Sequence, residues 1–181
     1  MNMISKNKAV NVKSKTYKNL MFAFAGESQA RNKYTYFSSV AKKEGYVELA
    51  KFFISIANNE KEHAKIWLKC LNQIGSTEKN LKQAIVGEHE EWTKMYKQMA
   101  IVAKKEGYLK IARLFENVAK IEKDHEQFFN LWLKNIKNKK VFNSNKAIKW
   151  RCSNCGYVVV AKTAPKICDT CNHSQSYFKK V

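Results

Sequence analysis

The chain has 181 residues with one proline and six glycines, and 45% of its residues are hydrophobic. This length allows one domain with a sizeable core and a small appendage, and the scarcity of turn-forming residues favours long helices. It contains no apolar run of about eighteen residues, which excludes a membrane span. Residues 1–14 are basic but lack the apolar block of a signal peptide. We therefore expect a cytoplasmic protein, in which cysteines bind metal more often than they form disulfides.

The formal net charge of +19 could steer anionic partners or bind phosphates. However, lysines are spread along every segment, and the only arginines are Arg31, Arg113 and Arg151. This distribution favours solubility and general electrostatic steering, so we do not expect a specific nucleic-acid partner.

The predicted elements begin with a flexible basic arm over residues 1–14. Helical periodicity then predicts helices over residues 16–44, 46–72, 81–105 and 108–137, with a polar connection at 73–80. Gly45 and Gly107 follow lysine pairs, as expected where a glycine ends a helix. We assign residues 15–137 to a four-helix bundle in which the connection between the second and third helices crosses the bundle's length. Residues 138–149 are interpreted as a polar linker, and residues 150–181 as a small domain with one strand candidate at 157–160.

The two predicted hairpins are an internal repeat. Residues 40–46 and 102–108 share the sequence Val-Ala-Lys-Lys-Glu-Gly-Tyr at an offset of 62 positions. The same offset relates two Glu-x-x-His pairs, whereas an earlier Gly-Glu pair matches with one residue of slippage. The matching positions are Glu60 with Glu122, His63 with His125, and Gly26-Glu27 with Gly87-Glu88. Duplication predicts a pseudo-twofold site between two related halves.

Polar groups interrupt the apolar stripe of each predicted helix. These inward carboxylates and imidazoles are Glu27, Glu60, His63, Glu88, Glu91, Glu122 and His125. Glutamates on two helices, with Glu-x-x-His on the other two, are typical of ferritin-like bundles that bind two iron or manganese ions. Five buried carboxylates would repel one another, and two divalent cations would leave a net charge of only about −1. Surface acids on helices of slipped register are the alternative, which the duplication disfavours. Glu91 has no equivalent, because Ala30 occupies its place in the first half.

Two Cys-x-x-Cys pairs in the tail predict a tetrahedral site of four sulfurs. They are Cys152 with Cys155 and Cys168 with Cys171. Gly156 and Asn172 follow the pairs and tolerate a left-handed backbone. Spacing alone leaves zinc and iron open, with a pair of disulfides as the weaker alternative. A tail this short depends on its metal for folding, while the unpaired Cys70 is interpreted as a small core residue.

Several of these stretches resemble the rubrerythrin family. They are Phe24 to Phe37, Asn59 to Lys65, Gly87 to Tyr96, Trp150 to Tyr157 and Cys168 to His173. The resemblance implies a ferritin-like four-helix bundle with a C-terminal rubredoxin-like domain. It also implies two irons joined by an oxo or hydroxo bridge, and one iron bound by the four cysteines, with zinc possible there in recombinant protein.

The resemblance also implies a role for each ligand. Glu60 and Glu122 would bridge the irons, Glu27 would bind one iron, and Glu88 with His125 the other. Glu91 would bind the first iron when it is oxidised, and His63 would replace it on reduction. Tyr34 and Tyr96 match positions that line the site and, with Glu91 and His63, are our candidate catalytic residues.

The activity implied by the resemblance is a peroxidase that reduces hydrogen peroxide to water. Electrons would come from NAD(P)H through an external reductase and donor protein, then through the cysteine-bound iron. A head-to-tail homodimer would place each tail beside the partner's bundle. Two alternatives from other classes are a ferroxidase or iron-storage protein and a zinc-ribbon nucleic-acid binder. The cysteine module argues against the first and the inward glutamates against the second.

Overall fold

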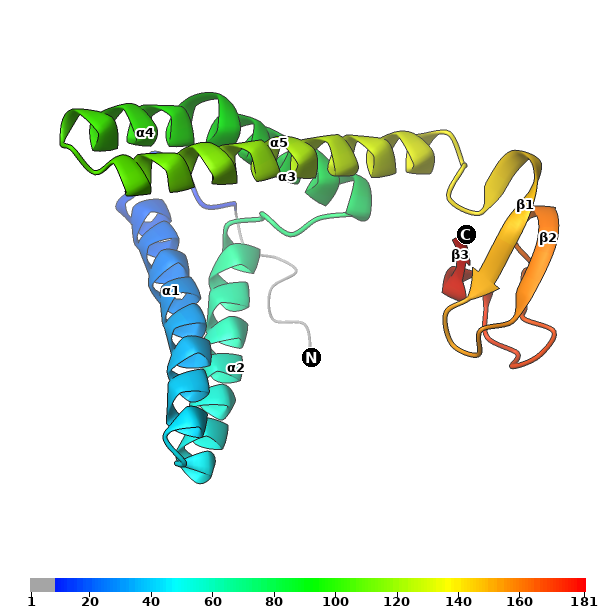
Figure 1. Ribbon diagram of the computed structural model, residues 1–181, viewed down its shortest axis with the longest axis horizontal. Coiled ribbons are helices and arrows are strands. Elements are labelled where there is room, and N and C mark those ends of the chain that lie inside the picture. Colours follow the sequence, from blue (N-terminus) through cyan, green and yellow to red (C-terminus); the bar gives the residue numbers. More distant parts are fainter. Residues whose placement is uncertain (1–8) are drawn as a thin grey trace. The chain divides into compact units, whose positions relative to one another are not determined.

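The computed structural model describes residues 9–181, so the predicted arm over residues 1–14 lies largely outside it. The described chain consists of two helical hairpins and a small three-stranded module (Figure 1). It divides into two compact units between Ser76 and Thr77. Among the described residues, no helix combines the length and apolarity that crossing a membrane requires.

The first hairpin pairs α1 (Lys15–Lys43) with α2 (Val47–Cys70). The Ser14 side chain caps α1 by accepting a hydrogen bond of 3.0 Å from the Tyr17 backbone N–H. Between the helices, Gly45 adopts a φ of +89°, which other residues rarely adopt. Both helices agree with the predicted ranges to within two residues.

The second hairpin begins with a helical rod in three parts, followed by its antiparallel partner. The rod consists of α3 (Thr77–Glu90), the π-helical turn η1 (Glu91–Met95) and α4 (Tyr96–Lys105). Gly107, with a φ of +84°, leads into α5 (Leu109–Lys137). The sequence did not predict the π-helical turn.

A single extra residue in the second hairpin accounts for the π-helical turn. Glu27 and Glu88 are 61 positions apart, whereas Tyr34 and Tyr96 are 62 apart, so the extra residue lies between Glu88 and Tyr96. The Tyr96 backbone N–H donates to the Glu91 carbonyl five residues earlier, which is the bond that defines this wide turn. The change of offset from 61 to 62 positions within the repeat therefore indicated the π-helical turn in the sequence.

The connection between the hairpins is shorter than expected. Since α3 begins at Thr77 and not near Leu81, only residues 71–76 separate it from α2. Seven peptide steps from Cys70 to Thr77 reach at most about 25 Å. The 24 residues of α2 span about 36 Å. The prediction that this segment crosses the bundle's length is therefore wrong.

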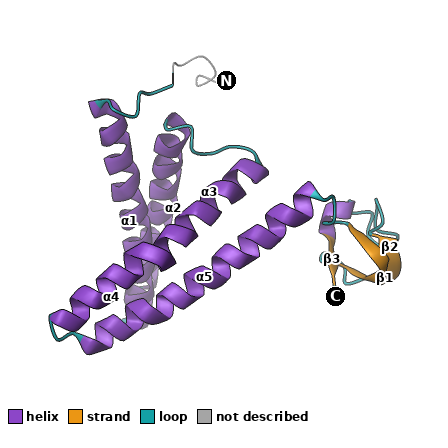
Figure 2. Ribbon diagram, turned by 90° about the horizontal axis from the view of Figure 1, so that it is seen from above, coloured by secondary structure: helices purple, strands orange, loops and turns teal. Residues whose placement is uncertain are grey.

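The C-terminal module is an antiparallel sheet of strand order β2-β1-β3 (Figure 2). The strands are β1 (Asn143–Cys152), β2 (Val158–Thr163) and β3 (Phe178–Lys180), with a 3-10 turn η2 (Gln175–Tyr177) before the last. The predicted linker is therefore shorter than expected, because residues 143–149 belong to β1 in spite of their polar composition. Asn143 pairs with Thr163 of β2, whose hydroxyl donates to the Asn143 side chain at 2.8 Å, and after an irregular stretch the pairing resumes at Ile148.

The two hairpins and the module differ in how they bury apolar side chains. In the module, Trp150, Cys152, Ala164, Cys168 and Phe178 form a compact buried core. The hairpins bury mainly alanines and leave large apolar side chains exposed, including Phe52, Leu114 and Phe128. Among the described residues, each arm of a hairpin packs against the other arm of the same unit, so a second apolar layer is needed to cover these side chains.

Candidate metal centres

The first candidate half-site lies between α1 and α2. Glu27, Glu60 and His63 each place a ligand atom within 4.8 Å of the others. His63 Nδ1 is 2.8 Å from Glu60 Oε2 and 4.0 Å from Glu27 Oε1. Glu60 and His63 are three residues apart on α2, so one helical face presents both toward α1. The His63 side chain remains 51% exposed within the hairpin, which leaves the half-site open on one side.

The second half-site repeats this geometry between α3 and α5. Glu88, Glu122 and His125 also lie within 4.8 Å of one another. His125 Nδ1 is 2.6 Å from Glu122 Oε2 and 3.6 Å from Glu88 Oε2. The duplicated Glu-x-x-His pairs and their glutamate partners therefore do come together, each within its own hairpin.

The carboxylates of the second half-site are crowded. Burial raises the pKa of Glu88, and the hydrogen bond and negative charge of Glu122 raise it further. The charge of Glu91 adds to this rise, while His125 opposes it. Burial followed by the charges of Glu91, Glu122 and Glu88 also raises the pKa of Tyr96. A cation would relieve this repulsion, so the donor set fits a metal of the iron or manganese kind.

Three other predicted residues lie outside these groups of three. Glu91 is the first residue of η1 and acts on Glu88 and Tyr96 only through its charge. Tyr34 packs against Phe53 with ring centroids 6.2 Å apart, and Tyr96 packs against Phe115 at 6.0 Å. Each tyrosine thus contacts a phenylalanine of the paired helix in its own hairpin.

The four tail cysteines form the third cluster. The Sγ atoms of Cys152 and Cys171 are 3.7 Å apart, as are those of Cys155 and Cys168. A tetrahedron with metal–sulfur bonds of about 2.3 Å has edges of about 3.8 Å, so the cluster fits one tetrahedral ion. Its two turns end on left-handed residues, as predicted: Gly156 at φ +81° and Asn172 at φ +58°.

The thiols of this cluster differ in acidity. The backbone hydrogen bond from His173 lowers the pKa of Cys171 to about 6, in spite of its burial. A backbone hydrogen bond from Tyr157 favours the Cys155 thiolate, but burial and the neighbouring thiols raise the pKa of Cys155 to about 12. Metal binding favours the thiolate forms of the cysteines, so loading the cluster releases thiol protons. Cys70, half-buried on α2, lies outside the cluster.

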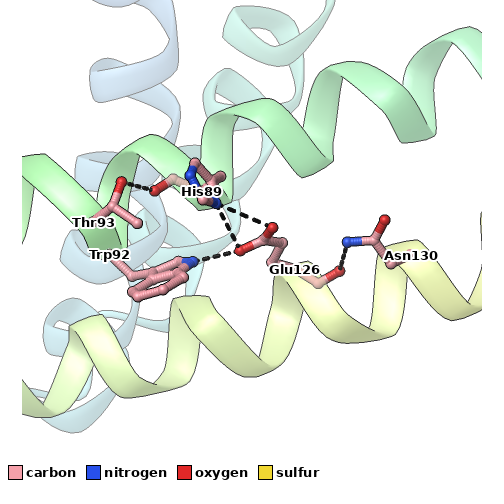
Figure 3. A network of polar contacts seen from close by, with 5 residues as sticks. All are labelled: His89, Trp92, Thr93, Glu126 and Asn130. Carbon is pink, nitrogen blue, oxygen red and sulfur yellow. Dashed lines mark hydrogen bonds and ion pairs between the residues drawn. The ribbon is translucent and has the colours of Figure 1, made fainter.

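Sequence reasoning missed a polar network beside the second half-site. His89 and Trp92 contact the carboxylate of Glu126, one residue beyond His125 (Figure 3). These residues flank predicted ligands but repeat nowhere in the first hairpin, so a search for duplicated positions passes over them. The absence of equivalent residues in the first hairpin was the sequence feature that could have indicated this network.

Two carboxylate–histidine half-sites on helical hairpins and a C-terminal four-cysteine module define a ferritin-like di-iron protein with a rubredoxin-like domain. The family model for rubrerythrin matches residues 18–133 and again 79–151, and that for the rubredoxin-like domain of rubrerythrin matches residues 150–179. The chain belongs to the rubrerythrin family. Its cofactors are accordingly iron, at di-iron-type carboxylate–histidine sites and at a four-cysteine site.

Curated relatives agree along most of the chain. Rubrerythrin-1 of Clostridium acetobutylicum is 45% identical, covering 92% of this chain and 94% of the relative. Rubrerythrin of Porphyromonas gingivalis is also 45% identical, with coverages of 93% and 90%. Among solved structures, nigerythrin in a mixed-valence state is 24% identical with a TM-score of 0.35, covering 99% of this chain and 92% of that one.

Proposed function

We propose that the chain is a non-haem di-iron peroxidase that reduces hydrogen peroxide to water with electrons delivered through the cysteine-bound iron. The observation that carries this proposal is the presence of both kinds of site in one chain. Reduction of one peroxide to two waters takes two electrons and two protons. Two irons would supply both electrons together, and the cysteine-bound iron would restore them singly. An iron-storage protein needs no such electron carrier.

Each ligand has a proposed role. Glu60 and Glu122 would hold both metals, Glu27 would hold one of them, and Glu88 with His125 would hold the other. Glu91 and His63 would be alternative ligands of the first iron, Glu91 in the oxidised and His63 in the reduced state. The asymmetry of the halves supports this exchange, because Glu91 corresponds to Ala30 in the first hairpin. A ferric ion prefers an anionic carboxylate, and a ferrous ion accepts a neutral imidazole.

Tyr34 and Tyr96 are proposed to line the peroxide pocket. The raised pKa of Tyr96 keeps its phenol protonated at neutral pH, so its hydroxyl can donate a hydrogen bond to a bound oxygen atom. Tyr34 occupies the corresponding place in the first hairpin, against Phe53. The two rings would thereby restrict water while offering two hydroxyl donors.

We further propose a homodimer in which helical hairpins are exchanged. Ferritin-like bundles need one long crossover between their second and third helices, and residues 71–76 are too short for it. Pairing α1–α2 of one subunit with α3–α5 of its partner removes that requirement and covers the apolar side chains that each hairpin exposes. In this head-to-tail dimer, the four-cysteine module of each chain would deliver electrons to a bundle that contains a hairpin of the partner.

The proposed electron route starts outside the chain. A donor protein, reduced by NAD(P)H through a reductase, would pass single electrons to the cysteine-bound iron in the cytoplasm. The excess of lysine over acidic residues favours a donor of negative surface charge.

The colour of the purified protein tests the function directly. Iron bound by four thiolates should make it red, dithionite should bleach the absorption, and hydrogen peroxide should restore it while being consumed. A colourless tail loaded with zinc in protein from its own cell would overturn the electron-transfer role. If the colour of the reduced protein returned on addition of oxygen but not of hydrogen peroxide, the proposed peroxidase activity would be overturned.

A further inference from the structure

The carboxylate of Glu126 joins α5 to the helical rod on both sides of Glu91. The Trp92 indole N–H donates to Glu126 Oε2, and His89 Nδ1 lies 3.2 Å from both carboxylate oxygens (Figure 3). His89 is two residues before Glu91 and Trp92 is one residue after it. A single acceptor on α5 therefore holds the end of α3 and the start of η1 together.

Further contacts strengthen the same junction. The Thr93 hydroxyl donates to the His89 carbonyl, across the start of the π-helical turn. The Lys123 ammonium lies 5.4 Å from the centroid of the Trp92 ring, which adds a second contact from α5 to that side chain. On α5 itself, the Asn130 side chain donates to the Glu126 carbonyl at 3.0 Å. The Glu126 side chain is only 19% exposed, so water competes weakly for its hydrogen bonds.

The first hairpin lacks every part of this arrangement. Ser28 and Ala64 occupy the positions that correspond to His89 and Glu126. The Ser28 hydroxyl donates to the Phe24 carbonyl within its own helix, and α1 continues without a π-helical turn. The network, the extra residue and the extra carboxylate thus occur together in one half of the duplicated chain. That coincidence links the network to Glu91 rather than to general packing of a hairpin.

A π-helical turn is wider than an α-helical turn, and its extra residue could sit at more than one place along the rod. Moving the turn by one residue would rotate the Glu91 side chain by about 100° around the helix axis. Bonds to His89 and Trp92 resist that movement, because a shift of the turn would pull one of them away from Glu126. The network is suited to fixing where the turn begins.

We propose that Glu126 is a positioning residue for Glu91. It fastens the π-helical turn at Glu91 so that this carboxylate stays in the position from which it would bind the first iron. The inference rests on the proposed role of Glu91 as a ligand of oxidised iron, but the fastening itself can be tested without metal.

Hydrogen exchange of the metal-free full chain tests the fastening. Trp92→Phe removes the indole donor and retains an aromatic ring, and Glu126→Ala removes the acceptor. We expect either change to speed exchange of the amides at residues 91–96 about tenfold, from loss of a charge-assisted hydrogen bond. Glu116→Ala is the matched control, since Glu116 also links α5 to the rod, through Lys104, at an exposed site. Equal effects of the control and test variants at residues 91–96 would overturn the fastening.

Iron release then separates positioning from a structural role. In oxidised, iron-loaded protein, Trp92→Phe should speed loss of iron to a chelator severalfold, with the cysteine-bound iron followed separately by its colour. After reduction the change should have little effect, because His63 then replaces Glu91. In a Glu91→Gln background the effect of Trp92→Phe should vanish, whereas independent contributions would add. Additive effects would overturn the positioning role. If Trp92→Phe speeds hydrogen exchange but Glu91→Gln leaves iron release unchanged, the proposed role of Glu91 as a ligand would be overturned instead.

Discussion

Two chains that each lack one bridging glutamate can test whether the bundle is shared between subunits. Glu60→Ala disables the half-site on α2, and Glu122→Ala disables the half-site on α5. In an exchanged dimer of one chain of each kind, one bundle receives both damaged hairpins and the other receives both intact ones. Complementation is therefore expected from two variants that are inactive alone.

The geometry behind this expectation is simple. Thr77 lies eleven residues before Glu88, and Cys70 seven residues after His63. If α2 and α3 ran parallel with their half-sites level, the ends to be joined would be about 27 Å apart along the axis, plus about 10 Å sideways. The connection reaches about 25 Å. The straight-line distance is about 29 Å, so a parallel arrangement within one chain would require a fully stretched connection and unwinding at a helix end.

The expected magnitude follows from random pairing. Half of the dimers in an equal mixture are mixed, and each mixed dimer has one intact bundle of two, so about a quarter of all bundles should bind a full iron pair. The mixed dimer, isolated through two different affinity tags, should show about half the wild-type peroxide consumption and half its bound iron beyond the four-cysteine site. Mixed dimers that remain at the level of the single variants would refute the exchange.

Three further substitutions have expected outcomes. Glu91→Ala should reduce peroxide turnover more than it reduces iron loading, and equal losses in metal analysis and turnover would remove its switching role. Trp150→Ala empties the fully buried centre of the module and removes the indole hydrogen bond to the Ala161 carbonyl. The module should lose about 3–5 kcal/mol of stability, so its red colour should disappear at a lower urea concentration. An unchanged urea midpoint would contradict the core assignment. Ser14→Ala removes the N-cap of α1 and should lower helix stability by about 1 kcal/mol. Amide hydrogen exchange should become faster in the first turn of α1 and nowhere else. Unchanged exchange there would show that the cap contributes nothing.

The helices and ligand clusters were predictable because they follow from periodicity and duplication. Apolar spacing gives the helices, and the repeated Glu-x-x-His pairs identify both half-sites before any coordinates are known. The start of α3 was missed because its first turn is polar. An ion pair of 2.9 Å between Glu78 and Lys82, rather than buried surface, spans that turn.

Two other features depended on information that a periodic pattern does not hold. The first half of β1 is polar on both faces, so it carries no alternating apolar pattern, and β2 pairs with it at Asn143 and again from Ile148 onward. The Glu126 network depends on which side chains meet across two helices, and His89 is exposed enough to look like an ordinary surface residue. Comparison of the two halves, residue by residue, would have indicated both the network and the π-helical turn.

The buried core of the C-terminal module has a consequence for how cells monitor this protein. Cys152 and Cys168 are two of the five buried core residues and also two of the four metal-binding thiols. A chain that fails to acquire its cysteine-bound iron thus also lacks the packing that protects the last thirty or so residues from proteases. Chains without metal at the four cysteines would expose an unfolded end to proteases, so the surviving population would be enriched in metal-loaded modules.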